Sequence, residues 1–159
     1  MDTWLPDLAG RLAAAHRAPS SGQMREPPLQ HNLVLILARN FASQLATAVF
    51  LVDVQGTVIY YNEAAERVLG RRFIEGHGMR LEEWTTAFFP SDAAGNPLSL
   101  EGIPLGAAIL RREPAHDVLA IRGGDGVDRR IEVTAFPLFA HTDDYVGAIA
   151  IFWQPPGDG

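Results

Sequence analysis

The side chains that could carry out chemistry in this chain are few and scattered. Its five histidines lie far apart and show no metal-ligand spacing: His16, His31, His77, His116 and His141. There is no cysteine, which excludes disulfides, thiolate metal sites and cysteine nucleophiles. No grouping of nucleophile, base and charge stabiliser is recognisable. The residues therefore favour a binding module with no metal site over an enzyme.

A small enzyme built as an α+β cone, such as an isomerase or a dehydratase, is the alternative. It would need an acid or a histidine that projects inward from a strand, and the candidates are Asp53, Asp117 and Glu132. Asp53 precedes a turn, which explains it better. Glu132 alternates with Ile131 and Val133 and therefore lies on the opposite strand face. The non-enzymatic interpretation is favoured.

The elements that would position these residues are clearest between positions 51 and 70. The segment LVDVQGTVIYYNEAAERVLG reads as a strand, a tight turn, a second strand and a capped helix. Gly56 is free to adopt the positive φ of a turn. Asn62 stands where an N-cap accepts a backbone N–H, and Gly70 ends the helix. This stretch predicts two paired strands followed by a short helix.

Further elements follow along the chain. Apolar alternation over 129–138 indicates a strand with one buried and one polar face, as in an antiparallel sheet. We expect strands at about 48–53, 58–61, 116–122, 129–138 and 145–153, and helices at about 62–69, 81–89 and 101–112.

The order of these pieces resembles a PAS domain, a sensory and dimerising module. The matching residues near the start are Asp53, Gly56, the run Tyr61-Asn62-Glu63-Ala64-Ala65, and Leu69-Gly70. Later segments that fit the family are 102–114, 129–138 and 146–152. The resemblance covers roughly residues 40 to 153. It implies an α+β fold, a PAS-like five-stranded antiparallel sheet with short helices on one face and an N-terminal amphipathic helix.

The chain divides into four parts. Residues 1–28 form an extension with a short helical pattern (Leu5, Leu8, Leu12) and a Pro/Ser linker, residues 29–46 a flanking helix, residues 47–153 the PAS domain, and residues 154–159 a flexible tail. The tail holds two prolines and two glycines and cannot continue a helix. We therefore expect a stand-alone module that acts on an unidentified signalling protein in trans, with a piece of a larger protein as the alternative.

The flanking helix is apolar on more than one face. Its stripe with a spacing of four is Leu33, Leu37, Phe41 and Leu45, and residues 34–36 widen it. One side can lie on the sheet, and a second copy of the chain is the economical cover for the other. We expect a homodimer through this helix; complete wrapping within one monomer is the alternative.

The resemblance also suggests an apolar pocket between the concave sheet face and the helices near 81–89 and 101–112. The candidate ligand-binding residues, with Tyr60 as a polar handle, are Phe50, Val52, Tyr60, Leu69, Phe73, Trp84, Phe88, Ile109, Ile131, Val133, Ile149 and Ile151. The ligand would be small and hydrophobic, and an acyl carboxylate would need a cation, for which Arg71, Arg72 and Arg80 are nearest. The same side chains would serve equally well as a filled core.

The sequence disfavours the cofactors known in the family. Relatives that bond flavin use a cysteine, which is absent, and relatives that bind haem often use a histidine on the helix before the central strand, where 98–112 has none. Noncovalent flavin would want polar inner-face side chains, whereas the inner faces are largely apolar. We expect neither haem nor flavin, although a sensor of that kind remains an alternative.

Net charge and hydropathy limit the classes of partner and the cellular location that the sequence favours. A net charge of −6 disfavours nucleic acid. The sequence has no run of about eighteen apolar residues, so it predicts no membrane span. The start of the chain lacks the basic and apolar regions of a signal peptide, so we expect a cytoplasmic bacterial protein whose arginine-only cations reflect a GC-rich genome.

Overall fold

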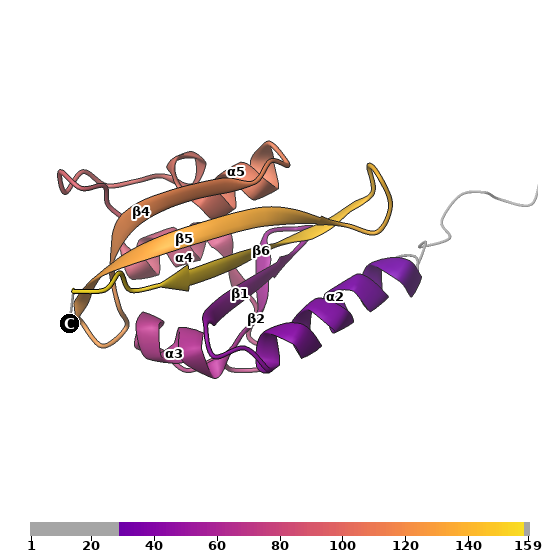
Figure 1. Ribbon diagram of the computed structural model, residues 1–159, viewed down its shortest axis with the longest axis horizontal. Helices are drawn as coiled ribbons and strands as arrows, with labels where there is room; N and C mark the ends of the chain where they lie inside the picture. The colour runs from indigo at the N-terminus through magenta and orange to yellow at the C-terminus, as the bar shows by residue number, and fades with distance from the viewer. Residues whose placement is uncertain (1–28, 158–159) are drawn as a thin grey trace, which may run out of the picture.

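The computed structural model describes residues 29–157 and places an antiparallel sheet between two layers of helix (Figure 1). The strand order is β3-β2-β1-β6-β5-β4. The strands are β1 (Ala48–Asp53), β2 (Thr57–Tyr61), β3 (Met79–Arg80), β4 (Ala115–Arg122), β5 (Asp128–Phe139) and β6 (Tyr145–Trp153). The five predicted strands are confirmed, and the two-residue β3 adds a sixth at the edge beside β2. The predicted short helix over residues 1–17 lies outside the described residues.

The helices come from the predicted segments, with one interruption. They are α2 (Leu29–Ser43), α3 (Glu63–Leu69), α4 (Leu81–Phe88), the 3₁₀ turn η1 (Leu100–Gly102) and α5 (Pro104–Leu110). The single helix predicted over 101–112 is therefore wrong in its continuity. Ile103 is extended, and Pro104, which has no N–H to satisfy, begins a new helix at its first position.

The junction of α2, β1 and α3 is held by the buried side chain of Asn62. Its Oδ1 accepts the backbone N–H of Ala65, at 3.0 Å, and that of Val49, also at 3.0 Å. Its Nδ2 donates to three carbonyl oxygens at 2.9–3.3 Å, those of Ala42, Leu45 and Thr47. The predicted N-cap is confirmed, and the same amide also fixes the chain that leaves α2.

The other end of α3 is held by the β4–β5 hairpin. Gly70 has a φ of 62°, as predicted for a residue that ends a helix, and Gly124 N–H donates to the Leu69 carbonyl at 2.8 Å. Within the hairpin, Arg129 Nη2 lies 2.6 Å from Asp125 Oδ2. This hydrogen-bonded ion pair lowers the pKa of Asp125 to about 2.

Each face of the sheet carries its own apolar cluster. On one face α3, α4 and α5 cover the inner cluster, which includes Phe50, Ile131 and Phe152. On the other face α2 lies against the outer cluster around Val49 and Ile149 (Figure 1). Helices thus cover both faces, so a candidate cavity must be sought between the sheet and one of these layers. No helix within residues 29–157 is long and apolar enough to cross a membrane.

Candidate functional site

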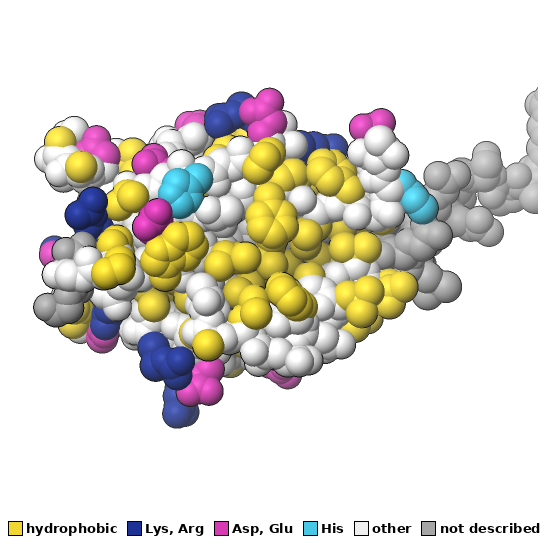
Figure 2. Space-filling model, viewed as in Figure 1, with side chains coloured by type: hydrophobic (Ala, Val, Ile, Leu, Met, Phe, Trp, Pro, Cys, Tyr) yellow, Lys and Arg dark blue, Asp and Glu magenta, His cyan; other side chains and the backbone are white. Residues whose placement is uncertain are grey.

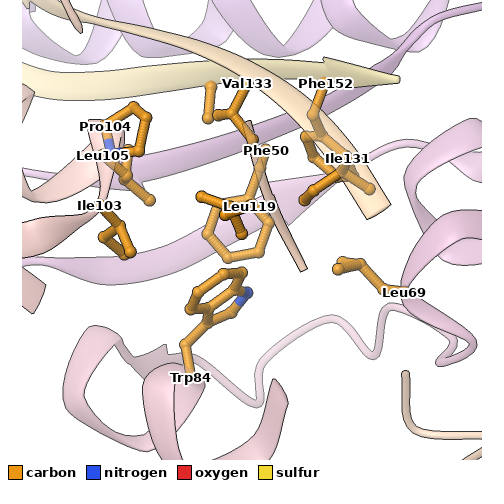
Figure 3. Close-up of a pocket in the computed structure, with 11 residues that line it drawn as sticks. Phe50, Leu69, Trp84, Ile103, Pro104, Leu105, Leu119, Ile131, Val133 and Phe152 are labelled. Carbon is orange, nitrogen blue, oxygen red and sulfur yellow. The ribbon is translucent and has the colours of Figure 1, made fainter. Parts of the chain in front are cut away.

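An apolar cavity lies inside the inner cluster, between the sheet and the helices α3, α4 and α5 (Figure 3). About 30 Å³ of it is open to the centres of water-sized spheres. The side chains around it come from seven elements and from Ile103, just before α5: Phe50, Leu69, Trp84, Ile103, Pro104, Leu105, Leu119, Ile131, Val133, Ala150 and Phe152. This space is large enough for about two water molecules or a comparably small ligand.

Aromatic contacts fix the wall that α4 presents to the sheet. The ring of Trp84 meets Phe50 of β1 edge-on, with centroids 5.8 Å apart, and meets Phe88 at 5.4 Å. Phe50 in turn stacks on Tyr61 at 5.8 Å with an interplanar angle of 9°. Burial raises the pKa of Tyr61, whose hydroxyl donates to the Arg72 carbonyl at 2.9 Å. Trp84 is thus held in orientation by rings on both sides.

The structure brings some of the predicted pocket residues together. Five line the cavity: Phe50, Leu69, Trp84, Ile131 and Val133. Four others belong to the inner cluster or pack against it, outside the cavity wall: Val52, Phe73, Phe88 and Ile109. The remaining three, Tyr60, Ile149 and Ile151, lie on the outer face among the residues near α2. Those three positions therefore do not border the cavity.

The two-residue period of a strand explains why Ile149 and Ile151 of β6 do not face the cavity. Ala148, Ala150 and Phe152 belong to the inner cluster, so the two isoleucines between them must face the other way. Both faces of β6 are buried, because α2 covers the outer one, and apolarity alone does not distinguish them. The pairing of Ala150 with Phe50 and with Ala135, both inner-face residues, settles the orientation.

The residues that sequence reasoning missed enter through η1, α5 and β4. Leu119 and Ile121 are two residues apart on β4 and therefore share one face, and this spacing is a usable signal for an inward face. Ile103, Pro104 and Leu105 reach the cavity because the chain breaks between η1 and α5. A continuous helix over 101–112 would not place these three residues together.

Neither Tyr60, the predicted polar handle, nor the indole nitrogen of Trp84 presents a polar group to the cavity, whose accessible lining is entirely apolar. Tyr60 lies on the outer face, where the Arg39 guanidinium sits 4.9 Å from its ring centroid. The Trp84 side chain is 8% exposed, and its indole Nε1 has no hydrogen-bond partner. Within the described residues one other buried side-chain atom shares this condition, the Tyr145 hydroxyl, and Tyr145 does not line the cavity.

Within residues 29–157, no charged side chain borders the cavity. Arg71 and Arg72 line a separate surface groove with Arg67, and Arg80 lies 3.6 Å from Glu82 on the solvent side of α4. The cations nearest in sequence are thus not placed to meet a ligand carboxylate. Nowhere in the described part of the chain do three or more His, Asp or Glu side chains gather as metal ligands would.

None of the acids considered for catalysis lines the cavity. Asp53 accepts the backbone N–H of Gln55 and of Thr57, at 2.9 Å each, within its turn. Asp117 is exposed and accepts the N–H of Val118. Glu132 lies on the outer face, between His116 and the Trp153 indole N–H. Each has a local structural role in the described fold.

The outward side of α2 forms a second candidate surface. Leu33, Ile36, Leu37 and Phe41 are 54–59% exposed. Leu45, the fourth residue of the predicted stripe, lies past the end of the helix and packs against the outer cluster. Figure 2 shows hydrophobic side chains gathered over this side of the molecule, across α2 and the neighbouring strands β5 and β6.

Known proteins resemble this chain in fold. A family model described as the PAS fold matches residues 41–155. The PAS domain of a protein from Colwellia psychrerythraea is 17% identical, with a TM-score of 0.52 over 77% of this chain and 97% of that one. The Rhodobacter sphaeroides LOV protein is 13% identical, with a TM-score of 0.60 over 82% and 70%. No curated protein matches the sequence.

Proposed function

Because this chain belongs to the PAS-fold family, we propose that it is a non-enzymatic sensory module that dimerises through α2 and acts on a partner protein in the cytoplasm. The family is generally one of sensory signalling domains. The observation that carries the proposal is the outward face of α2. Its four large apolar side chains are more than half exposed, while the opposite side of the helix packs on the sheet.

A second copy of the chain is the occupant that this face favours. Single exposed apolar residues are ordinary, but a contiguous row beside a half-buried sheet face is typical of an interaction site. Phe136, Leu138 and Ile151 continue the apolar surface next to α2 and are only partly buried. Two such surfaces related by a twofold axis would cover each other.

Small-ligand uptake by the cavity is the sensory part of the proposal. The cavity wall is apolar and carries no charge among the described residues, which suits a small neutral hydrophobic molecule. Its 30 Å³ is far too small for a flavin ring system, and the chain has no cysteine that could bond one. The LOV neighbours, at 20% identity or less, support the fold and not a flavin site in this protein.

The dimer is tested by placing charges on the outward face of α2. Sedimentation velocity should give the wild type about twice the 17.3 kDa of one chain. The double variant Leu37→Asp/Phe41→Asp should sediment as a monomer with an unchanged circular dichroism spectrum, because each chain would bring two unpaired carboxylates into the buried interface.

Val127→Asp is the control for the added charge. Val127 is a comparably exposed apolar residue, 50% exposed, in the β4–β5 hairpin and away from α2. It should leave the wild-type mass unchanged. A wild type that is already monomeric at the highest attainable concentration would contradict the dimer.

A further inference from the structure

The loop of residues 70–78, between α3 and β3, closes part of the edge of β2. In the described sheet, β3 pairs with β2 at Thr57 and Val58 and not at Tyr60 or Tyr61. Phe73 of the loop meets both tyrosine rings edge-on, with centroids 5.6 Å and 5.1 Å away. Tyr61 belongs to the inner cluster and Tyr60 packs against the outer one, so this single ring contacts both faces of the sheet.

On the inner side, a row of rings continues from Phe73 to the wall of the cavity. Tyr61 stacks on Phe50, its partner across β1 and β2, and Phe50 meets Trp84. Trp84 points from α4 toward the sheet (Figure 3). The Tyr61 hydroxyl also donates to the Arg72 carbonyl, at 2.9 Å. The loop is therefore fixed to the same ring that packs between Phe50 and Phe73.

On the outer side, the contact continues to α2 through Arg39. Its guanidinium lies 4.9 Å from the centroid of the Tyr60 ring, and its Nη2 donates to the carboxylate of Glu75 in the same loop. A guanidinium over an aromatic face is attracted by the quadrupole of the ring. Arg39 thus ties α2 both to β2 and to the loop that carries Phe73.

The rest of α2 is held to the sheet by a shallow contact. Leu35 and Ala38 are partly buried against the outer cluster, and among the described side chains of the helix Ala42 alone is fully buried. Asn62 anchors the C-terminal end of the helix through the Ala42 carbonyl. The preceding turns depend on Arg39 and on a few apolar contacts, and a segment with few buried contacts can open locally without global unfolding.

We propose that Phe73 couples the packing of the inner cluster to the attachment of α2 to the sheet. A rearrangement at Trp84 shifts the row of rings and the loop with it, and so weakens the contacts that Arg39 makes. The element with two states is α2, which is either held on the sheet or locally detached. The inference rests on the proposed dimerisation through α2 and names the route by which a change in the inner cluster reaches that helix.

The test measures amide hydrogen exchange of α2 in the full-length chain with Leu37→Asp/Phe41→Asp, so that no dimer interface protects the helix. Adding Phe73→Leu keeps an apolar side chain and removes the ring. Exchange in α2 should become about tenfold faster, the size expected for the loss of two edge-to-face contacts. Exchange in β5, which lies between β4 and β6, should not change. Ile74→Ala is the matched control, since this neighbour in the loop is 58% exposed, and it should leave α2 unchanged.

Coupling to the inner cluster is tested by Trp84→Phe in the same background. Alone, this variant should make exchange in α2 about threefold faster. Combined with Phe73→Leu, it should add no further change, because the route is already interrupted. Ile121→Val is the control for a core substitution: Ile121 belongs to the inner cluster but lies on β4, at the opposite edge of the sheet from β2 and the loop. It should leave exchange in α2 unchanged.

The inference and the proposed dimer fail in distinguishable ways. If Phe73→Leu leaves exchange in α2 unchanged, or if Trp84→Phe has the same effect with and without the Phe73 ring, the coupling is overturned. Either result leaves the sedimentation of the wild type as it was. A wild type that sediments as a monomer contradicts the dimer, whereas the exchange measurements, made on single chains, still decide whether Phe73 connects the inner cluster to α2.

Discussion

The side chains of Asn62 and Trp84 are both buried N–H donors, and the fold treats them in opposite ways. The Asn62 amide uses every group it has, with two backbone N–H groups donating to its oxygen and three carbonyls accepting from its nitrogen. The Trp84 indole, 8% exposed, has no partner among the described residues. The hydrogen bonds of Asn62 are complete within the described residues, whereas the Trp84 donor is left unsatisfied there.

The difference separates a hydrogen-bonded junction from a wall held by ring packing alone. Asn62 connects the chain leaving α2 to β1 and α3, so the position of the proposed dimer helix depends on it. Trp84 contacts the core through its rings alone, on a helix without a side-chain cap. A fully satisfied network makes a joint rigid, whereas an unsatisfied buried donor carries an uncompensated desolvation cost.

The largest effect should come from removing the complete network with Asn62→Ala. The buried N–H groups of Val49 and Ala65 and the Thr47 carbonyl would lose their side-chain partner, at about 1–3 kcal/mol each. We expect the free energy of unfolding, measured with urea, to fall by about 3–5 kcal/mol. Asn40→Ala, at an exposed position of α2, is the control and should change it by less than about 0.5 kcal/mol.

If Asn62→Ala lowers the free energy of unfolding only slightly, the comparison fails, because water would then be replacing the amide. The same variant should also weaken the dimer, since the end of α2 would no longer be fixed. If sedimentation shows an unchanged dimer in a strongly destabilised variant, the joint matters for folding and not for the position of α2.

The N-cap bond of Asn62 is predictable from the sequence, whereas its other hydrogen bonds and the unpaired nitrogen of Trp84 are not. The N-cap role of Asn62 is local, because its acceptor contact with Ala65 lies three residues away. Its contacts with Ala42 and Thr47 depend on how α2 meets the sheet, which no local pattern encodes. The antiparallel sheet follows from the resemblance, and the five predicted strands agree with the structure to within about one residue.

The cavity depends on packing between distant segments. The sequence places Ile149 and Ile151 inward because both faces of β6 are apolar, and one residue of register reverses the assignment. The break at Pro104 turns three further side chains toward the space. Trp84 is among the predicted lining residues, but its unpaired nitrogen is visible only when every neighbouring acceptor has been placed.

The second effect in size should come from enlarging the cavity with Leu69→Ala. Leu69 is fully buried between α3 and the cavity, and truncation of such a residue costs about 2–4 kcal/mol. The enlarged apolar space should bind benzene, which would restore part of the lost stability in a thermal melt. Arg67→Ala, exposed on the same helix, should show neither change.

An exposed ion pair gives a smaller and pH-dependent effect at the far end of α3. Ionised Asp125, paired with Arg129, has a folded-state pKa of about 2, below the ordinary value of 3.8. Its contribution is therefore fully present above about pH 4, the pKa in the unfolded chain, and is lost as the pH falls through about 2. The stability gap between wild type and Asp125→Asn should be constant from about pH 7 to 5 and close toward pH 2.

Urea unfolding at about pH 7, 4 and 2.5 measures this gap, with Asp143→Asn in an exposed loop as the control. A gap that persists at the lowest pH would mean that the Asp125 side chain acts through packing against Gly70, and not through its charge. Asn62 at the other end of α3 has no charge, so its effect should show no such pH dependence.

The smallest effect should come from Trp84→Phe in the absence of ligand, and it tests the comparison most directly. The smaller ring loses packing, while removal of the unpaired donor relieves a desolvation cost of about 1–3 kcal/mol, so the two changes oppose each other. We expect the free energy of unfolding to change by less than about 1 kcal/mol. Trp153→Phe removes a made hydrogen bond to Glu132 from a half-buried ring and should lower it by more. The opposite ranking would show that Trp84 Nε1 already has an acceptor, such as a buried water, and that this donor is as complete as Asn62.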